Sequence, residues 1–186
     1  MRLRIADCGL RIDRAIAGLM IGAALQAPAR AEIIDRMVAI VRPAGESVGG
    51  QVITMSDVVA ARDLGLQPAT GPDPIRAVLT KLIDRELELA EVDRYAPPEP
   101  SVEAIDREFA ALRARFASPA AFADVLARTG VDERHLRELL RQDLRIRAYE
   151  DQRFAASGDR RAEVFEAWMA GLRRRSDVVD LYQSGR

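Results

Sequence analysis

The apolar residues between Ile75 and Tyr95 constrain the fold more than any other feature of this 186-residue sequence. They recur every three or four positions, which puts their side chains on one face of an α-helix. Asp73 and Pro74 provide a helix start in front of them, and the prolines of "APPEP" (96–100) interrupt the helix behind them. The spacing therefore predicts one long amphipathic helix. The residues of its apolar stripe are Ile75, Val78, Leu79, Leu82, Ile83, Leu87 and Ala90.

Later segments carry the same two signals, a capping residue followed by apolar residues at helical spacing. Their capping residues are Ser101, Ser118, Asp132 and Asp159. A shorter helix is predicted in front of the long one, beginning at Ser56 or Asp57 and ending at Gly65. About six helices are therefore expected, and they account for most of the chain.

Two short segments rich in β-branched residues precede the helices, namely "RMVAIVR" (36–42) and "QVITM" (51–55). Turn formers in "PAGESVGG" (43–50) separate them, so we expect a hairpin with a long loop. A hairpin alone is marginally stable in water. The segment "DVVDLY" (177–182) reads as a last strand, and we expect it to pair with the hairpin. The predicted fold class is mostly α, a multi-helix body with a small antiparallel sheet.

The first 31 residues have the organisation of an export signal. Arginines precede the apolar run "AIAGLMIGAAL" (15–25), and Ala29-Arg30-Ala31 is a small-x-small cleavage pattern. An uncleaved membrane anchor is the alternative, but a run of about 11 residues is short of the roughly 20 that span a bilayer. We therefore expect a signal peptide at 1–31, cleaved near Ala31, a periplasmic location, and no stable membrane insertion afterwards. The remaining 32–186 are expected to form one domain, in which 161–186 complete the hairpin and helices of 32–160.

Charge and composition exclude several classes of function. Without residues 1–31 the chain has 23 basic and 27 acidic side chains, whereas a nucleic-acid binder usually carries a basic excess. The single cysteine, Cys8, lies in the signal, so disulfides and thiol chemistry are not expected. His135 is the single histidine, which leaves too few ligands for a histidine or cysteine metal cluster, and we interpret it as a solvated surface residue. No cofactor, no metal and no nucleic-acid partner are expected.

The remaining candidates for chemistry also have structural explanations. Acidic residues alternate with arginines, as in "DRELELAEVDR" (84–94), which is typical of solvated helix faces with local ion pairs. Paired catalytic carboxylates need an apolar pocket that separates their pKa values, and this pattern does not indicate one. Trp168 could stack on a ligand, but its helical spacing with Phe165 and Leu172 favours the core. The sequence therefore predicts a protein that is not an enzyme.

The order of the segments resembles a known family. An export signal is followed by "EIIDRMVAIV", "QVITMSDV", "LTKLIDRELELAEVDRY", "SVEAIDREFAAL" and "GVDERHLRELLRQDLRIRAYE". This resembles the N-terminal domain of SurA-type periplasmic chaperones over roughly residues 32–155, and most specifically in the two strand segments. The chain departs from the family in having no segment long enough for a parvulin-type prolyl isomerase domain, and its loop "RPAGESVGG" is longer than the family's usual turn. The segment "EVFEAWMAGLRRRSDVVDLY" (163–182) is similar to the family's C-terminal segment, which completes the N-terminal domain.

The resemblance implies an ATP-independent chaperone that binds unfolded polypeptide clients, with outer-membrane proteins as the expected class and without isomerase activity. The alternative is a non-catalytic interaction subunit that holds one dedicated folded envelope partner. An isomerase and a DNA-binding helical protein are weaker alternatives, because the chain lacks a parvulin-sized segment and a basic excess. Residues that could line a peptide-binding groove are Met55, Phe109, Phe116, Phe122 and Leu126. Met and Phe make adaptable contacts, but for any single one of these residues the usual burial of large apolar side chains favours the core.

Overall fold

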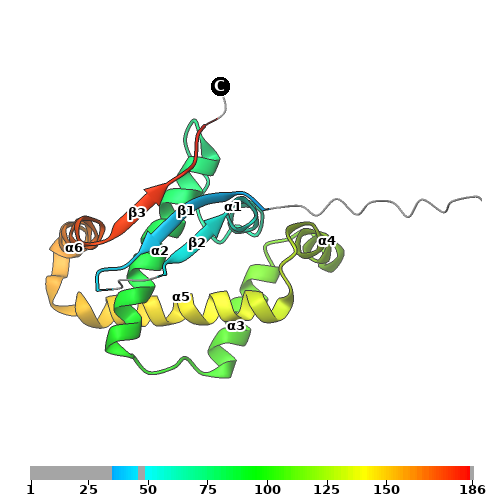
Figure 1. Ribbon diagram of the computed structural model, residues 1–186. Helices are drawn as coiled ribbons and strands as arrows, with labels where there is room; N and C mark the ends of the chain where they lie inside the picture. Colours follow the sequence, from blue (N-terminus) through cyan, green and yellow to red (C-terminus); the bar gives the residue numbers. More distant parts are fainter. Residues whose placement is uncertain (1–34, 46–48, 185–186) are drawn as a thin grey trace, which may run out of the picture. The chain divides into compact units, whose positions relative to one another are not determined.

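The computed structural model describes residues 35–45 and 49–184. The signal expected at residues 1–31 lies outside the described residues, as does part of the hairpin loop. The described residues form six α-helices and three β-strands (Figure 1). This confirms the predicted fold class, mostly helical with a small antiparallel sheet.

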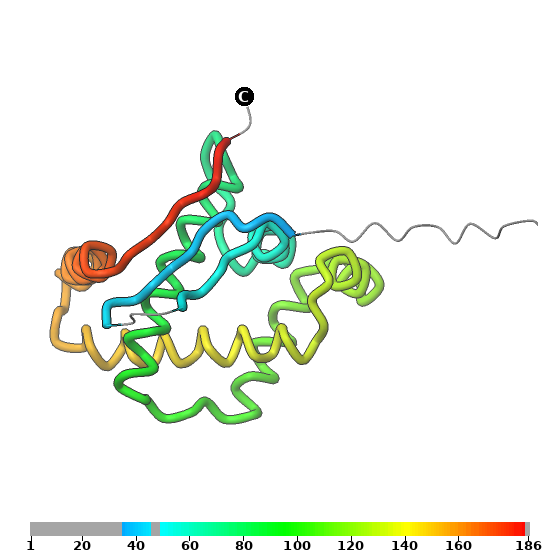
Figure 2. Tube along the Cα trace, in the orientation of Figure 1, coloured from blue at the N-terminus to red at the C-terminus, as the bar shows by residue number. Residues whose placement is uncertain are grey.

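The three strands form one sheet in the order β2-β1-β3, with both pairings antiparallel. β1 (Met37–Arg42) and β2 (Gln51–Thr54) make the hairpin, and β3 (Asp177–Asp180) pairs with the other side of β1. Figure 2 shows the blue start and the red end of the described chain lying side by side. The prediction that the last strand returns to the hairpin is therefore confirmed.

The joint between β2 and the first helix differs from the prediction in detail. α1 (Met55–Asp63) begins one residue after β2, and Thr54 is its N-cap in place of Ser56 or Asp57. The Thr54 hydroxyl accepts from the Asp57 N–H, and the Asp57 carboxylate accepts from the Thr54 N–H at 2.8 Å. This reciprocal capping box satisfies two free donors at once, so it fixes the point at which strand becomes helix.

Four of the predicted helix starts are confirmed by side-chain caps. Asp73, Ser101, Ser118 and Asp132 each accept from the backbone N–H three residues ahead. The helices that follow are α2 (Pro74–Tyr95), α3 (Val102–Arg113), α4 (Pro119–Thr129) and α5 (Glu133–Arg153). Short-range hydrogen bonds of this kind depend on neighbouring residues only, which is why the sequence predicts them well.

The last helix starts differently from the prediction at Asp159. Residues Ala155–Arg160 form a 3₁₀ helix, and α6 (Arg161–Arg175) follows without a side-chain cap. Gly158 has a φ of 52°, a left-handed conformation that favours glycine, so the chain turns here before α6 begins. α6 then packs Met169 and Leu172 against the sheet side, and Trp168 is half-buried against Tyr149 and Phe154.

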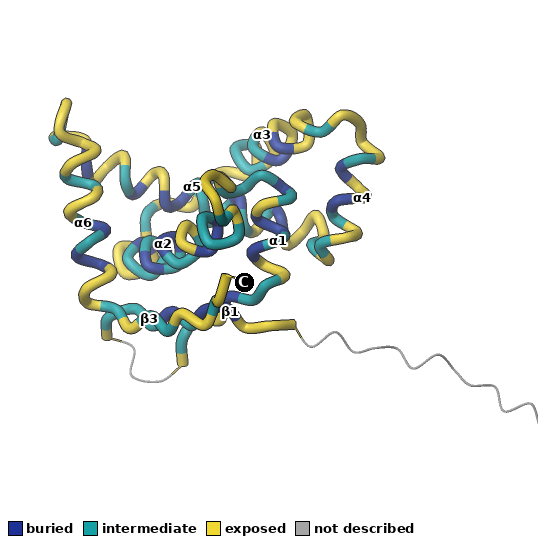
Figure 3. Tube along the Cα trace, turned by 90° about the horizontal axis from the view of Figure 1, so that it is seen from above, coloured by how far each residue is buried: buried dark blue, intermediate teal, exposed yellow. Residues whose placement is uncertain are grey.

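The buried residues divide into two main clusters. The sheet-side core joins one face of the sheet to α1, α2 and α6, and includes Val38, Val41, Ile53, Val58, Leu79, Leu87, Met169 and Leu172. The helical core joins α3, α4 and α5 to the end of α1, and consists of Leu64, Phe109, Leu112, Phe122, Val125, Leu136 and Leu140. A small third cluster of Val92, Ile146 and Tyr149 links α2 to α5. Figure 3 shows α3 and α4 largely exposed, with only their inner faces buried.

Candidate functional site

An open groove of about 830 Å³ lies between the sheet-side core and the helical core. It is lined by β2, by α1, α2 and α5, and by the turns that follow α1 and α4. In Figure 1, β2 lies at the edge of the sheet nearest α5, and Figure 3 shows α2 between the sheet and α5. Rim residues such as Ser56, Arg134 and Glu138 are exposed, so the groove opens to solvent.

Two helices contribute one stripe each to the groove. From α2 the lining residues are Leu82, Arg85, Glu86 and Leu89, and from α5 they are Arg134, His135, Glu138, Leu139, Gln142 and Asp143. Within each set the residues recur every three or four positions, which places their side chains on a single helix face. Each stripe mixes apolar and polar residues, so the groove offers apolar contacts and hydrogen-bonding groups together.

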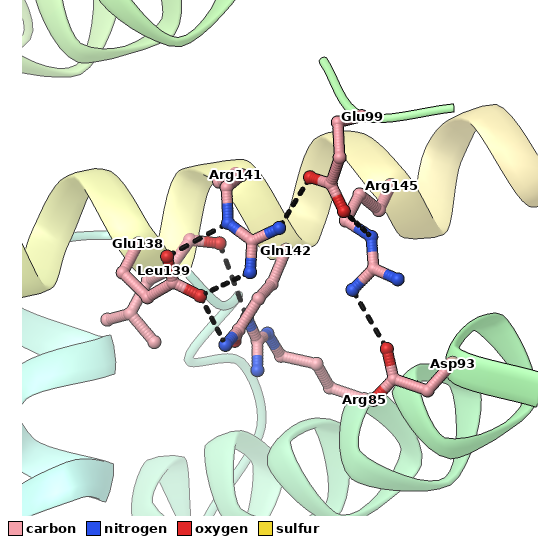
Figure 4. A network of polar contacts seen from close by, with 8 residues as sticks. All are labelled: Arg85, Asp93, Glu99, Glu138, Leu139, Arg141, Gln142 and Arg145. Atoms are coloured by element: carbon pink, nitrogen blue, oxygen red, sulfur yellow. Dashed lines mark hydrogen bonds and ion pairs between the residues drawn. The ribbon is translucent and has the colours of Figure 1, made fainter. Parts of the chain in front are cut away.

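Arg85 fixes the distance between the two stripes. It is 8% exposed, and its Nε donates to Asp143 Oδ1 at 2.8 Å while Nη2 donates to Gln142 Oε1 at 2.9 Å and to the Leu139 carbonyl at 3.3 Å. Nη1 donates to Glu86 Oε1 at 3.2 Å. Figure 4 shows the Arg85 side chain reaching from α2 to the groove face of α5. A buried guanidinium needs such partners, and here they brace α2 against α5.

A second group of ion pairs ties α5 to α2 and to the segment that follows α2. Arg145 is 8% exposed, and its Nη1 donates to Asp93 at 2.8 Å while its Nε lies 3.2 Å from Glu99. Arg141 also pairs with Glu99, and it reaches back to Glu138 Oε1 at 2.7 Å (Figure 4). Glu99 belongs to the proline-rich segment between α2 and α3, so these contacts tie that segment to α5. The far wall of the groove is held from both sides.

The groove lining carries more acidic than basic groups. Asp57, Glu86, Glu138 and Asp143 face two guanidinium groups, those of Arg85 and Arg134. Burial raises the pKa of Glu86, and the nearby charge of Arg85 offsets part of this effect. Hydrogen bonds from Arg141 lower the pKa of Glu138, which keeps that carboxylate charged at the rim. The groove is therefore suited to a ligand with apolar and basic groups.

The residues predicted from the sequence for peptide binding lie outside this groove lining. Phe109 and Phe122 are 6% and 3% exposed in the helical core, where their rings pack edge to face at 5.8 Å. Phe116 and Leu126 are half-buried against the same core, and Met55 is half-buried against the sheet-side core. All five contribute to packing, and their part in client binding stays a prediction.

The sequence did not single out the residues that do line the groove. Leu82 belongs to the apolar stripe that the sequence predicts for the long helix, and the sequence places His135 on the solvated surface. His135 is indeed exposed, at the groove rim. Leu139 is half-buried, belongs to none of the three buried clusters of the described residues, and lines the groove. The sequence signal that could have indicated these residues is the width of the apolar stripe on each helix, which is more than one packed neighbour covers.

Comparison of the chain with protein-family models and with curated proteins finds no match. Within residues 35–45 and 49–184, no helix is long and apolar enough to cross a membrane. The same residues contain no cluster of three or more histidine, cysteine, aspartate or glutamate side chains arranged to hold a metal ion. The groove is thus the feature from which a function has to be argued.

Proposed function

We propose that this protein is an ATP-independent periplasmic chaperone that binds unfolded polypeptide in the groove between β2 and α5 and performs no chemistry on it. The observation that carries the proposal is the groove itself, about 830 Å³ in volume and bordered by apolar side chains of α2 and α5 and by a strand edge. This volume lies at the upper end of the range of ligand pockets, and the groove opens to solvent, so an extended chain segment can enter it.

The energetics of the groove fit a holding role. Apolar contact with residues such as Leu82, Leu89 and Leu139 stabilises a bound segment by about 25 cal/mol per Å² of apolar area buried. Ordering an unfolded segment costs conformational entropy, which offsets much of that gain. Net affinity is therefore modest, so a client can leave for a better-packed destination without an energy source.

The class of client rests on the resemblance to SurA-type chaperones, which points to unfolded outer-membrane proteins. The periplasmic location rests on the expected export signal at residues 1–31. The alternative function is an interaction subunit that holds one folded envelope partner. It predicts one tight complex in pull-downs and no effect on unfolded proteins.

The test is light scattering of an unfolded outer-membrane protein diluted from urea, with rising amounts of the purified protein and no nucleotide. We expect suppression of aggregation at a near-stoichiometric ratio. Aggregation that stays unchanged over a wide range of ratios would overturn the proposal.

A matched pair of variants locates the activity. Leu139→Gln places a polar side chain in the groove, whereas Leu181→Gln makes the same change at a leucine that is 41% exposed beyond β3. Glutamine suits a helix almost as well as leucine, so α5 is expected to keep its structure. We expect Leu139→Gln to need several times more protein for equal suppression and Leu181→Gln to match the wild type. Equal behaviour of the two variants contradicts the assignment to the groove.

A further inference from the structure

β2 has one free edge, and it borders the groove. Because the sheet order is β2-β1-β3, β2 is paired on one side only. The other edge strand, β3, continues into residues that are tied to α2: Arg76 Nη2 donates to the Tyr182 carbonyl at 2.7 Å, and Tyr182 Oη contacts Asp73 at 3.2 Å. The edge at β3 therefore continues into a segment anchored to α2, whereas the edge at β2 borders the groove.

The direction of the backbone groups along β2 follows from its hydrogen bonds. The Met55 N–H donates to the Arg36 carbonyl at 2.8 Å, so Met55 faces β1. Peptide groups alternate in direction along a strand, so Ile53 and Gln51 also face β1, and Thr54 and Val52 face away from it. The Thr54 N–H agrees with this, because it donates to Asp57 on the side away from β1.

The free edge therefore presents the N–H and C=O of Val52, and by the same alternation those of Gly50, toward the groove. No described residue forms a hydrogen bond with these groups. Proteins usually protect such an edge with charged side chains or proline, and "QVIT" contains neither. An unprotected edge beside an apolar groove is a site for an added strand.

We infer that the groove binds an extended client segment as a fourth strand on β2. The inference rests on the proposed function and states how it works. The Thr54 N–H is already bonded to Asp57, so the free edge runs from Gly50 to Ile53, roughly 10 Å at about 3.3 Å per residue. Successive side chains of the added strand point to opposite faces. One set meets the apolar groove face of α2 and α5, and the other set faces the outer side of the sheet.

The pattern of the client follows from this arrangement. Apolar residues are required at the alternate positions that face α2 and α5, and the positions between them, which face the outer side of the sheet, are polar. Backbone hydrogen bonds supply affinity that does not depend on sequence. The site therefore selects segments in which apolar and polar residues alternate, and it does not require particular residues. Transmembrane strands of β-barrels carry this alternation, which fits the proposed client class.

Backbone methylation of a peptide tests the inference directly. The probe is a ten-residue peptide alternating leucine or phenylalanine with lysine or serine, and binding is measured by fluorescence anisotropy. Two further versions carry N-methyl groups, one on the apolar positions and one on the polar positions. Because a one-residue slip would turn the apolar side chains to solvent, the register is fixed. We expect one methylated version to lose at least tenfold in affinity and the other to bind like the parent.

A change in the protein provides the second test. Val52→Pro removes the N–H that faces the free edge and leaves the hydrogen bonds between β2 and β1 in place. Val52→Thr is the matched control, because it keeps the N–H and the β-branched shape. We expect Val52→Pro to bind the parent peptide at least tenfold more weakly and Val52→Thr to bind it normally, with the fold of each checked by circular dichroism.

The outcomes separate this inference from the proposed function. Equal binding of both methylated peptides, with aggregation still suppressed, overturns strand addition and leaves the chaperone function standing. Loss of both peptide binding and aggregation suppression in the wild type overturns both. A self-associated protein whose β2 edge is occupied by a second copy, seen by sedimentation and unable to bind peptide, also overturns strand addition.

Discussion

The sheet-side core and the helical core are assembled from the chain in different ways. The sheet-side core needs β1 from the start of the described chain and β3 and α6 from its end. The helical core needs α3, α4 and the first half of α5, which follow one another, with Leu64 as its contribution from α1. Closing a long loop costs more chain entropy than closing a short one, so the first region depends on distant contacts and the second on local ones.

The difference explains where the groove lies. Its β2, α1 and α2 sides belong mainly to the sheet-side core, and α5 contributes Leu136 and Leu140 to the helical core while it lines the groove with Leu139. Two regions with separate cores leave a seam between them. Arg85 spans that seam, and its polar contacts with Asp143, Gln142 and the Leu139 carbonyl tie α2 to α5 beside the groove.

The largest expected effect comes from removing the centre of the helical core. Phe122→Ala removes a ring that packs between Phe109 and Phe116, and we expect a loss of about 4 kcal/mol in unfolding free energy. Because the two cores are separate, we expect amide hydrogen exchange in this variant to accelerate most in α3 and α4, while β1 to β3 keep most of their protection.

The matched control is Phe165→Ala on α6, a half-buried ring packed against the sheet-side core. We expect a smaller loss of about 2 kcal/mol, with the faster exchange in α6 and β3. If each variant accelerates exchange uniformly in both regions, the two cores form one cooperative unit and the comparison is wrong.

A somewhat smaller effect is expected at the ion pair that docks α6. Asp84 is 6% exposed and accepts two hydrogen bonds from Arg173, at 2.7 and 2.6 Å. Arg173→Ala leaves this carboxylate buried without its partner, which costs about 3 kcal/mol. We expect β3 and α6 to lose protection first, as measured by hydrogen exchange, with α4 little changed.

Arg174→Ala is the control, because Arg174 is the next residue of α6 and is exposed. We expect it to stay within about 0.5 kcal/mol of the wild type. Recovery of stability in the double variant Asp84→Asn and Arg173→Ala assigns the loss to the stranded charge. A double variant as unstable as Arg173→Ala would argue for lost packing instead.

The smallest expected effect depends on pH. It compares a glutamate whose pKa is raised with one whose pKa is lowered. Burial raises the pKa of Glu88 on α2 to about 8, with the charges of Glu150 and Asp84 adding to the shift. Glu138, at the groove rim on α5, has its pKa lowered by hydrogen bonds from Arg141. A raised carboxyl pKa gives stability that is complete below the ordinary value of 4.5 and is lost as pH rises to about 8.

Urea unfolding at pH 5 and pH 8 tests this, with Glu88→Gln against the wild type. Glutamine cannot ionise, so the variant is expected to gain about 2 kcal/mol over the wild type at pH 8 and little at pH 5. Glu103→Gln, at an exposed glutamate of α3 with a lowered pKa, is expected to show no such gain. A Glu88→Gln variant that follows the wild type at both pH values contradicts the assignment.

Much of the fold could be predicted because its signals are local. The capping residues Asp73, Ser101, Ser118 and Asp132 bond to N–H groups three residues ahead, and no distant partner is needed for that choice. Thr54 was missed as a cap because three consecutive β-branched residues read as strand to the end. Its role depends on the Asp57 carboxylate accepting a hydrogen bond from the Thr54 N–H. A pattern of residue types does not show which of Thr54, Ser56 and Asp57 makes this bond.

The candidate site could be predicted less well. Phe109 and Phe122 are candidates from the sequence because they are large apolar residues on short helices. In the structure the ring of Phe109 on α3 packs against that of Phe122 on α4, and both are buried. Leu139 has the same helical spacing as buried Leu136 and Leu140, so periodicity alone does not distinguish a core leucine from a groove leucine. A leucine on α5 belongs to the core only where another helix packs against its side of α5, and the sequence of α5 does not contain that information.

By itself the sequence determined the elements of this protein, their order and most of their starts, together with the return of the last strand to the hairpin. These follow from contacts between near neighbours and from the need of a lone strand to find a partner. Only the tertiary structure decided that Arg85 ties α2 to α5, that β2 keeps a free edge, and that a groove lies between β2 and α5. The physical reason is that the distance between two helices is set by the side chains of both, and the spacing within either one does not contain it.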